Sequence, residues 1–442
     1  MSISSFERVS ALRYHLMTSP NSSTFGFVRR NQTLYCENVD CAHIAKEFGT
    51  PCYVYSRAVI EHNLNEFEKA LSEVRHEIRY ALKANSAAGI LQIIAKRGLG
   101  VDTVSEGEIR RARRAGIPAE KIVFSGVGKT DAEIRYALQE GIGCFNVESV
   151  TELHRLNDIA TQLDIVAPFS IRCNPDVDAQ THPYISTGLK KNKFGVPIEF
   201  AEKLYLDSAN HPYLKAVGVD AHIGSQILDP RPHTESAHKL IDLILTLKRE
   251  GIELEHIDIG GGYGIAYEEH EKAPALAEFF TPIITLLKKA GLSQLAVMVE
   301  PGRSIVASAG VLLSTVQYMK DTGSRVFCIT DTGMNDLIRP ALYSAWMNIE
   351  ALHPSDVEPR LMDVVGPVCE SADFLGKERK LAVGAGDILV VFDAGAYGAS
   401  MASHYNSRAL PTEILVDEGK IRVLRAPEAF DDIISGDNLI SL

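Results

Sequence analysis

The chain has 442 residues, of which 45% are hydrophobic and 23% are charged. This composition is typical of a globular protein with one to three domains, and it excludes collagen-like, disordered and disulfide-framework classes. The 45 Lys and Arg residues against 57 Asp and Glu give a net charge of −12, which disfavours nonspecific binding to nucleic acid or to anionic membranes.

Apolar runs and cysteines indicate the compartment. No run approaches the roughly 20 apolar residues that cross a bilayer, and the first residues, MSISSFERVSALRYHL, lack the pattern of a secretory signal. The seven cysteines include no Cys-x-x-Cys pair, which favours reduced thiols over a zinc site. We therefore expect a cytoplasmic protein with no metal and no membrane or nucleic-acid partner.

Eight short apolar runs between residues 77 and 300 predict β-strands, and segments with helical spacing lie between them. The runs are EIRYAL (77–82), GVDTV (100–104), IVF (122–124), CFNV (144–147), FSIRC (169–173), VGVDAH (217–222), IDI (257–259) and LAVMVE (295–300). Strands that alternate with helices favour parallel βαβ units in an α/β fold, and eight strands close a (β/α)8 barrel. A doubly wound open sheet is the alternative, since periodicity alone does not distinguish the two.

After about residue 306 the pattern changes to strands with few helices between them: VLLSTVQYM (311–319), RVFCIT (325–330), DILVVF (387–392), EILVD (413–417) and KIRVL (420–424). We expect an N-terminal segment, 1–46, a barrel domain, 47–305, and a mainly β C-terminal domain, 306–442. The stretch TFGFVRRNQTLYC (24–36) is also β-like and is expected to pair with the C-terminal domain. The polar connection 174–197 is long enough to suggest a functional or disordered segment.

Reactive groups of such barrels lie where the strands end, so the residues after each predicted strand are candidates. Lys83 follows the first strand, in YALKANS. A lysine that reaches solvent is the commoner explanation, whereas a partly desolvated amine with a lowered pKa would suit covalent chemistry with an aldehyde. His222 follows the sixth strand, and alone it is most simply a structural histidine. The last two strands lead into DIGGGYG (258–264) and EPGRS (300–304), and glycine-rich loops at these positions form the usual phosphate site.

An amine, a phosphate loop, a carboxylate and a histidine on one face of a barrel suit pyridoxal phosphate. Lys83 would bind the aldehyde of the cofactor covalently, and Gly261 and Gly262 would hold its phosphate. Glu300 would keep the pyridine nitrogen protonated, and His222 could stack on the ring.

Further motifs extend this pattern over nearly the whole chain, apart from about the first 50 and the last 25 residues. They are YALKAN (80–85), GVDTVSEGEI (100–109), RCNPDVDAQTHPYISTG (172–188), KFG (193–195), HIGSQI (222–227), GGGYG (260–264), EPGR (300–303), RPALY (339–343), GPVCESAD (366–373) and GAYGASMASHYNSR (395–408). With these motifs the chain resembles the fold-type III pyridoxal-phosphate decarboxylases, and most closely the branch that acts on meso-2,6-diaminopimelate.

The resemblance implies roles toward the cofactor. Lys83 would carry pyridoxal 5'-phosphate, His222 would stack on its ring, and Glu300 would pair with the pyridine nitrogen. The remaining contacts, mainly to the phosphate, would come from Ser225, Gly261, Gly262, Gly302, Arg303 and Tyr397.

The resemblance also implies roles toward the substrate. The expected substrate contacts are Arg303, Arg339 and Tyr343 to its far carboxylate, Glu370 to its distal ammonium, and Tyr397. Cys369 would be the acid that protonates Cα, so that Lys83, His222 and Cys369 form the catalytic set. In the family Cys369 and Glu370 enter from the second subunit, which implies an obligate homodimer with shared active sites.

The implied activity removes the carboxyl group at the D-configured centre of meso-diaminopimelate, giving L-lysine and CO₂, as the last step of lysine biosynthesis. A decarboxylase of ornithine, arginine or lysine is one alternative, but its substrate has no far carboxylate for Arg303 and Arg339. An alanine racemase-like enzyme would need a second base, for which no motif is found. A non-catalytic paralogue that only binds pyridoxal phosphate would have no use for the acid Cys369.

Two remaining patterns favour no site. The basic run IRRARRAG (109–116) fits the exposed face of a helix in an acidic protein, and YEEHEK (267–272) does not have the spacing of a metal-binding helix.

Overall fold

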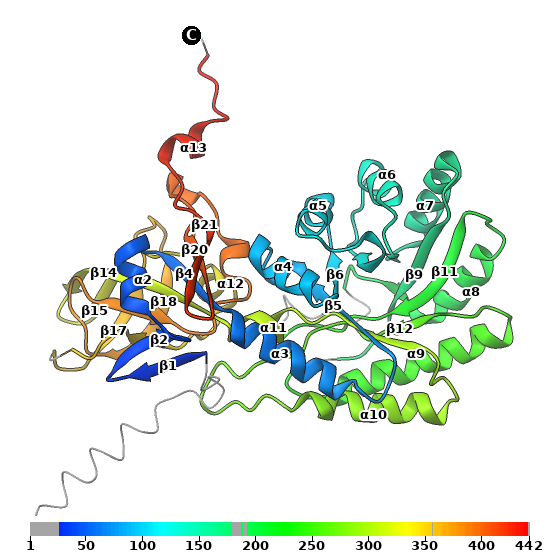
Figure 1. The fold of residues 1–442 in the computed structure, drawn as a ribbon, viewed down its shortest axis with the longest axis horizontal. Helices are drawn as coiled ribbons and strands as arrows, with labels where there is room; N and C mark the ends of the chain where they lie inside the picture. Colours follow the sequence, from blue (N-terminus) through cyan, green and yellow to red (C-terminus); the bar gives the residue numbers. More distant parts are fainter. Residues whose placement is uncertain (1–25, 179–186, 189–191, 356, 441–442) are drawn as a thin grey trace, which may run out of the picture.

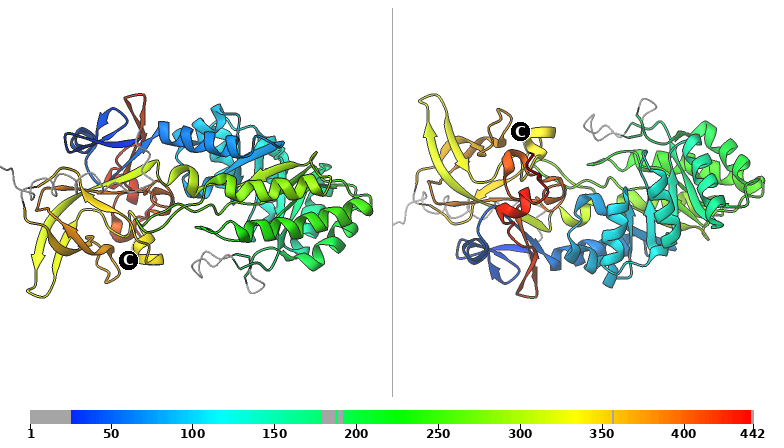
Figure 2. Two further views of the ribbon diagram at one scale, coloured as in Figure 1. Left: turned by 90° about the horizontal axis from the view of Figure 1, so that it is seen from below. Right: turned by 90° about the horizontal axis from the view of Figure 1, so that it is seen from above.

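The computed structural model describes residues 26–178, 187–188, 192–355 and 357–440. Two parts lie side by side along the long axis: a barrel covered by helices, and a mainly β part that carries the C-terminal segment (Figure 1). Figure 2 shows the same arrangement from below and from above. Within the described residues no helix is long and apolar enough to cross a membrane.

The barrel consists of eight parallel strands, β5 (His76–Ala81), β6 (Gly100–Thr103), β7 (Ile122–Phe124), β8 (Cys144–Val147), β9 (Ala167–Asn174), β11 (Leu214–Asp220), β12 (His256–Asp258) and β13 (Ala296–Val299). Their order is β9-β11-β12-β13-β5-β6-β7-β8, and a parallel pairing of β8 with β9 closes the ring. All eight predicted strands are therefore confirmed. The closed ring rules out the open sheet, and the two-residue β10 (Val196–Pro197) extends the β9 edge.

Helices cover the outside of this ring, so the strands are buried on both faces and read as continuous apolar runs. The long helices are α3 (Arg57–Ala70), α4 (Ala88–Lys96), α5 (Glu106–Arg114), α6 (Asp131–Glu140), α7 (Val150–Leu163), α8 (Ile198–Ser208), α9 (Arg231–Arg249) and α10 (Leu276–Lys289). The segment TDAEIRYALQEG shows how the sequence sets their ends. Thr130 forms a capping box with Glu133, and Gly141 ends α6 in the left-handed conformation.

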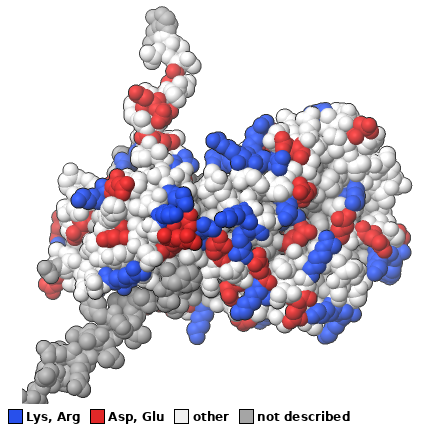
Figure 3. All heavy atoms as spheres, viewed as in Figure 1, with Lys and Arg blue, Asp and Glu red and all other residues white. Residues whose placement is uncertain are grey.

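The basic run 109–116 lies mostly on α5. There Arg110 pairs with Glu106 at 2.6 Å, and Arg113 pairs with Glu140 at 3.0 Å. On the face shown in Figure 3, basic and acidic side chains are interspersed over the barrel. The run is therefore an ion-paired helix face, as the sequence indicates.

The second part is built on a sheet with the order β18-β17-β15-β14-β4-β20-β21, in which β19 also pairs with β14 and with β16. Its strands are β4 (Cys52–Ser56), β14 (Gly310–Asp321), β15 (Val326–Thr330), β16 (Ile349–Ala351), β17 (Arg360–Val365), β18 (Phe374–Leu381), β19 (Ile388–Val391), β20 (Thr412–Asp417) and β21 (Lys420–Arg425). The five predicted strands are all present. The short helices α11 (Arg303–Val306), α12 (Arg339–Tyr343) and α13 (Phe430–Ile434) complete this half of the chain.

The N-terminal segment forms a separate sheet of β1 (Phe27–Arg30), β2 (Thr33–Cys36) and β3 (Val39–Asp40), followed by α2 (Cys41–Phe48). It packs on the β part: Phe27 and Leu34 share a buried cluster with Val311, and Arg29 donates to the carbonyl of Leu352 at 3.0 Å. The strand that joins the larger β sheet is β4, which lies between β14 and β20. The domain boundaries at residues 46 and 305 stay predictions.

Candidate active site

A cavity of about 430 Å³ lies at the carboxyl ends of the barrel strands, where residues of the β part reach the barrel. The predicted site residues that line it are Lys83, His222, Ser225, Gly262, Glu300, Gly302, Arg303, Arg339, Tyr343 and Tyr397. Gly261 lies directly behind the lining, because its N–H donates to His222 Nδ1 at 3.1 Å. The sequence-predicted residues are thus brought together, apart from Cys369 and Glu370.

Lys83 lies just after β5 and is half-buried. Its Nζ donates to Oδ2 of the fully buried Asp102 at 2.8 Å. Burial disfavours the ammonium, but the charges of Asp102 and Glu300 outweigh burial and raise the pKa of Lys83 above its ordinary value. The expectation of a lowered lysine pKa is therefore wrong for the cofactor-free chain, because the sequence did not show the carboxylates that face the amine.

The loop after β12 needs glycine because its backbone packs closely against neighbouring backbone. A Cβ on Gly261 would lie 2.1 Å from the carbonyl oxygen of Glu300, and one on Gly262 would lie 2.3 Å from that of Gly224. Gly262 also has a φ of +92°, which disfavours other residues. Only glycine therefore fits at both positions, as expected for the glycine-rich loop of a barrel phosphate site.

His222 follows β11 and presents its ring to the cavity. Burial and the nearby cations Arg172 and Lys83 lower the pKa of His222 well below its ordinary value. The imidazole is therefore neutral, and Nδ1 accepts the Gly261 N–H while the ring face stays available for stacking.

Glu300 ends β13 and lies against two further buried carboxylates. Oxygen atoms of Asp220, Asp258 and Glu300 lie within 4.8 Å of one another, and among the described residues Asp220 Oδ1 and Asp258 Oδ2 have no hydrogen-bond partner. Burial, and then the charges of Asp102 and Asp258, raise the pKa of Glu300 well above its ordinary value. The three buried carboxylates are therefore stabilised by a proton or a nearby cation, and a protonated pyridine nitrogen at Glu300 would supply one.

This cluster predicts how stability depends on pH in the cofactor-free protein. Burial raises the pKa of Asp258 to about 7, so the folded chain keeps a proton that the unfolded chain releases near pH 4. Stability is therefore lost as pH rises between these values. Asp258→Asn keeps an oxygen for the Gly260 N–H, which lies 2.8 Å from Asp258 Oδ1. The substitution is expected to stabilise the protein by about 3 kcal/mol more at pH 8 than at pH 5.

Urea unfolding of the cofactor-free wild type and Asp258→Asn at both pH values measures this difference. Equal effects of the substitution at pH 5 and pH 8 would contradict the raised pKa, whereas a general packing defect would destabilise the variant at both.

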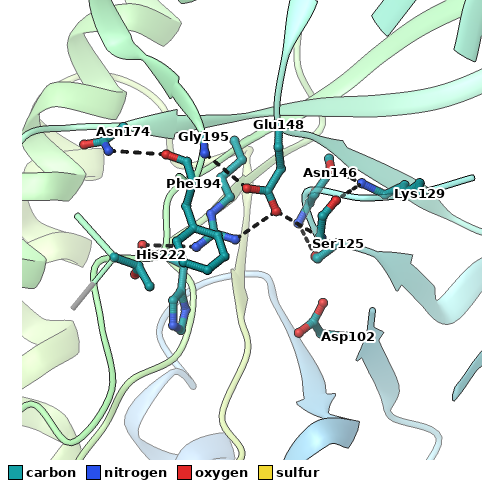
Figure 4. A network of polar contacts seen from close by, with 12 residues as sticks. Asp102, Ser125, Lys129, Asn146, Glu148, Asn174, Phe194, Gly195 and His222 are labelled. Atoms are coloured by element: carbon teal, nitrogen blue, oxygen red, sulfur yellow. Dashed lines mark hydrogen bonds and ion pairs between the residues drawn. The ribbon is translucent and has the colours of Figure 1, made fainter. Parts of the chain in front are cut away.

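A polar network behind the cavity fixes the backbone of His222 (Figure 4). Glu148, directly after β8, accepts hydrogen bonds from Arg172 Nη1 at 3.0 Å, from the Gly126 N–H at 3.0 Å and from the Gly195 N–H at 3.1 Å. Arg172 in turn donates to the carbonyl of His222 at 3.5 Å. The network ties the ends of three neighbouring strands to the histidine.

Arg303 and Arg339 form the cationic end of the cavity. Both are buried, with 7% and 5% of their surfaces exposed, and among the described residues neither takes part in an ion pair. Arg303 donates to Ser225 Oγ at 3.0 Å and lies over the ring of Tyr397, with 4.9 Å from Cζ to the ring centroid. Two buried guanidinium groups that form no ion pair suit an anionic ligand.

Cys369 and Glu370 lie apart from this cavity. They are exposed on the connection between β17 and β18, and neither lines the cavity. The N–H of Cys369 donates to Oδ1 of Asn406 at 3.2 Å. Within one chain, the expected acid and the expected ammonium-binding residue are thus on the surface.

The sequence reasoning missed four residues that shape the site: Asp102, Glu148, Arg172 and Tyr267. Asp102 and Arg172 stand near the ends of buried strands, in GVDTV and SIRC, and a charge at that position is a usable signal. Tyr267 lies in YEEHEK, three residues after the glycine loop, and no sequence pattern marks it.

Comparisons with known proteins show the family of this chain. Residues 57–307 match the family model described as "Pyridoxal-dependent decarboxylase, pyridoxal binding domain", so the chain belongs to the pyridoxal-dependent decarboxylases. It is 47% identical over 414 residues to a diaminopimelate decarboxylase of Pseudomonas aeruginosa. The alignment covers 94% of this chain and 99% of that protein. Within the class, the chain therefore belongs to the diaminopimelate decarboxylases.

Solved structures show the same likeness. Diaminopimelate decarboxylase from Helicobacter pylori complexed with L-lysine superposes with a TM-score of 0.86 at 43% identity, over 89% of this chain and 98% of that one. Diaminopimelate decarboxylase from M. jannaschii in co-complex with L-lysine superposes with a TM-score of 0.89 at 37% identity, and the match covers 94% of this chain and 98% of that one. These structures share both the barrel and the β part with this chain.

Proposed function

We propose that the protein removes the carboxyl group at the D-configured centre of meso-2,6-diaminopimelate and releases L-lysine and CO₂, with pyridoxal 5'-phosphate as cofactor. The observation that carries the proposal is the pair Arg303 and Arg339, which are buried and, among the described residues, form no ion pair, in the cavity that also contains Lys83. The named relatives, two of them solved with L-lysine, support this substrate. The reaction would be the last step of lysine biosynthesis.

The residues around the cofactor have distinct roles in this proposal. Pyridoxal phosphate, when bound, accepts the electron pair left at Cα as the carboxyl group departs. Lys83 supplies the amine that holds the cofactor, and the neutral ring of His222 supports one face of the pyridine. Glu300 keeps a proton on the pyridine nitrogen, and Ser225, Gly261, Gly262 and Gly302 provide the phosphate contacts.

At the other end of the cavity, Arg303, Arg339 and Tyr343 bind the carboxylate that does not react. Tyr397 lies beside Arg303 and contacts both cofactor and substrate. Cys369 delivers the proton to Cα, and Glu370 binds the distal ammonium.

We further propose a homodimer in which each active site uses residues of both chains. Cys369 and Glu370 are exposed and outside the cavity of their own chain, so they serve a site only if a second copy presents them to it. A closed two-fold dimer creates two such shared sites at once. The seven unpaired cysteines suit a reducing compartment, in line with the expected cytoplasmic location.

CO₂ release by the purified protein with added pyridoxal phosphate tests the activity. We expect release from meso-diaminopimelate, with L-lysine as product, and at least about 100-fold lower kcat/KM for L-lysine, L-ornithine and L-arginine, because these leave the two arginines without their carboxylate. Equal or greater activity on one of these monocarboxylates would keep the cofactor and reject the assigned substrate.

A further inference from the structure

Tyr267 stands between the two arginines of the cavity. It lies beyond the glycine loop, lines the cavity and is 8% exposed. The Cζ atom of Arg339 lies 4.5 Å from the centroid of its ring. Arg303 Nη1 donates to the phenol oxygen at 2.8 Å, and its Cζ lies 5.8 Å from the same centroid.

Without an anion between them, the two guanidinium groups repel each other. Burial lowers the pKa of Arg339, and the charge of Arg303 lowers it further. An aromatic face attracts cations within about 6 Å of its centroid, and a phenol oxygen accepts a charge-assisted hydrogen bond. Tyr267 therefore attracts both arginines without occupying the position at which an anion would bind between them.

The tyrosine is itself held in place by its neighbours. Glu271 Oε2 accepts hydrogen bonds from the N–H of Tyr267 at 2.8 Å and from that of Glu268 at 3.3 Å. Gln226 Oε1 accepts from the Ile265 N–H at 3.2 Å. Gln226 directly follows Ser225, to which Arg303 donates a hydrogen bond. The segment around Tyr267 and the side chain of Arg303 are therefore bonded to the same loop.

We propose that Tyr267 is a positioning residue that holds Arg303 and Arg339 as a preformed clamp for the carboxylate at the unreacting end of the substrate. This inference rests on the proposed function. It names the residue that makes the site selective for ligands with that carboxylate. A ligand with that carboxylate depends on Tyr267, whereas a ligand of the same length without it does not.

L-Lysine and 1,5-diaminopentane form the matched pair of ligands, since both have the same chain and only lysine keeps the unreacted carboxylate. Their dissociation constants are measured by calorimetry on the cofactor-loaded protein, for wild type, Tyr267→Phe and Tyr267→Leu. We expect Tyr267→Leu to weaken L-lysine about tenfold or more, and Tyr267→Phe, which keeps the ring, to weaken it less. Binding of 1,5-diaminopentane should change less than about twofold.

The matched control is Tyr136→Leu. Tyr136 also lies under an arginine, with 4.1 Å from Arg110 Cζ to its ring centroid, but it lies on α6 and does not line the cavity. This variant should bind both ligands as wild type does. The absorption of the bound cofactor should be the same in all variants, and the KM for meso-diaminopimelate should rise by a larger factor in Tyr267→Leu than kcat falls.

Equal weakening of both ligands, or unchanged affinity for L-lysine in both Tyr267 variants, would overturn the clamp. If wild type releases no CO₂ from meso-diaminopimelate but Tyr267→Leu still loses L-lysine selectively, the proposed activity fails and the clamp stands. If wild type is active and the selectivity is unaffected, only the role of Tyr267 is rejected.

Discussion

Replacing Lys83 by alanine is expected to lower CO₂ release by at least about 10³-fold, as for other residues that bond covalently to the reacting group. The amine lies in the cavity beside the carboxylates of Asp102 and Glu300, and without it the cofactor has no lysine to which it can attach. The absorption band of the lysine-linked cofactor should disappear, which a spectrum of the protein after gel filtration measures directly.

Lys83→Arg separates the charge from the chemistry. The guanidinium keeps a cation next to Asp102, which lies 2.8 Å from Lys83 Nζ, so the fold is expected to tolerate it. Arginine stays protonated and cannot attach to the cofactor as the amine does. Both variants should therefore lose the band, and Lys83→Ala should also lose stability because Asp102 is left buried without its ion pair. A retained band in either variant would contradict the assignment of Lys83.

The fold was predictable wherever burial produced uninterrupted apolar runs. Strands such as β6 and β13 are buried along their whole length and are apparent in the sequence. The strands β17 and β18 were not predicted, because only part of each is buried: in FLGKERKL the charged residues KERK are exposed or half-exposed and interrupt the apolar run. Strand β16 has only three residues, and unlike the equally short β7 and β12 it lies outside the alternation of strands and helices that marked the barrel.

The site was predictable where glycines and charges form local motifs, and less so where its properties arise from distant contacts. Lys83 and Glu300 each stand out at the end of an apolar strand. The direction of the Lys83 pKa could not be read from its neighbours in sequence, because it depends on Asp102, 19 residues away. Likewise, Tyr267 becomes significant only when the fold places Arg303 and Arg339 against it.

Mixing two inactive variants is expected to restore activity if the sites are shared. In a dimer of one Lys83→Ala chain and one Cys369→Ala chain, one site contains both substitutions and the other contains neither. Random exchange makes half of all dimers mixed, so activity should recover to about a quarter of the wild-type value. The recovery is measured as CO₂ release after exchange in dilute denaturant, with mixed dimers counted by mass spectrometry.

A second mixture serves as the control, in which Lys83→Ala is combined with Glu300→Ala. Both residues line the same cavity of one chain, so every site in a mixed dimer lacks one of them and no activity should return. Recovery in the first mixture and not in the second requires Cys369 to act on the cavity of the other chain. If mixed dimers form and the first mixture stays inactive, the exposed Cys369 does not serve the partner's site, and the proton donor must be sought among the residues that line the cavity itself.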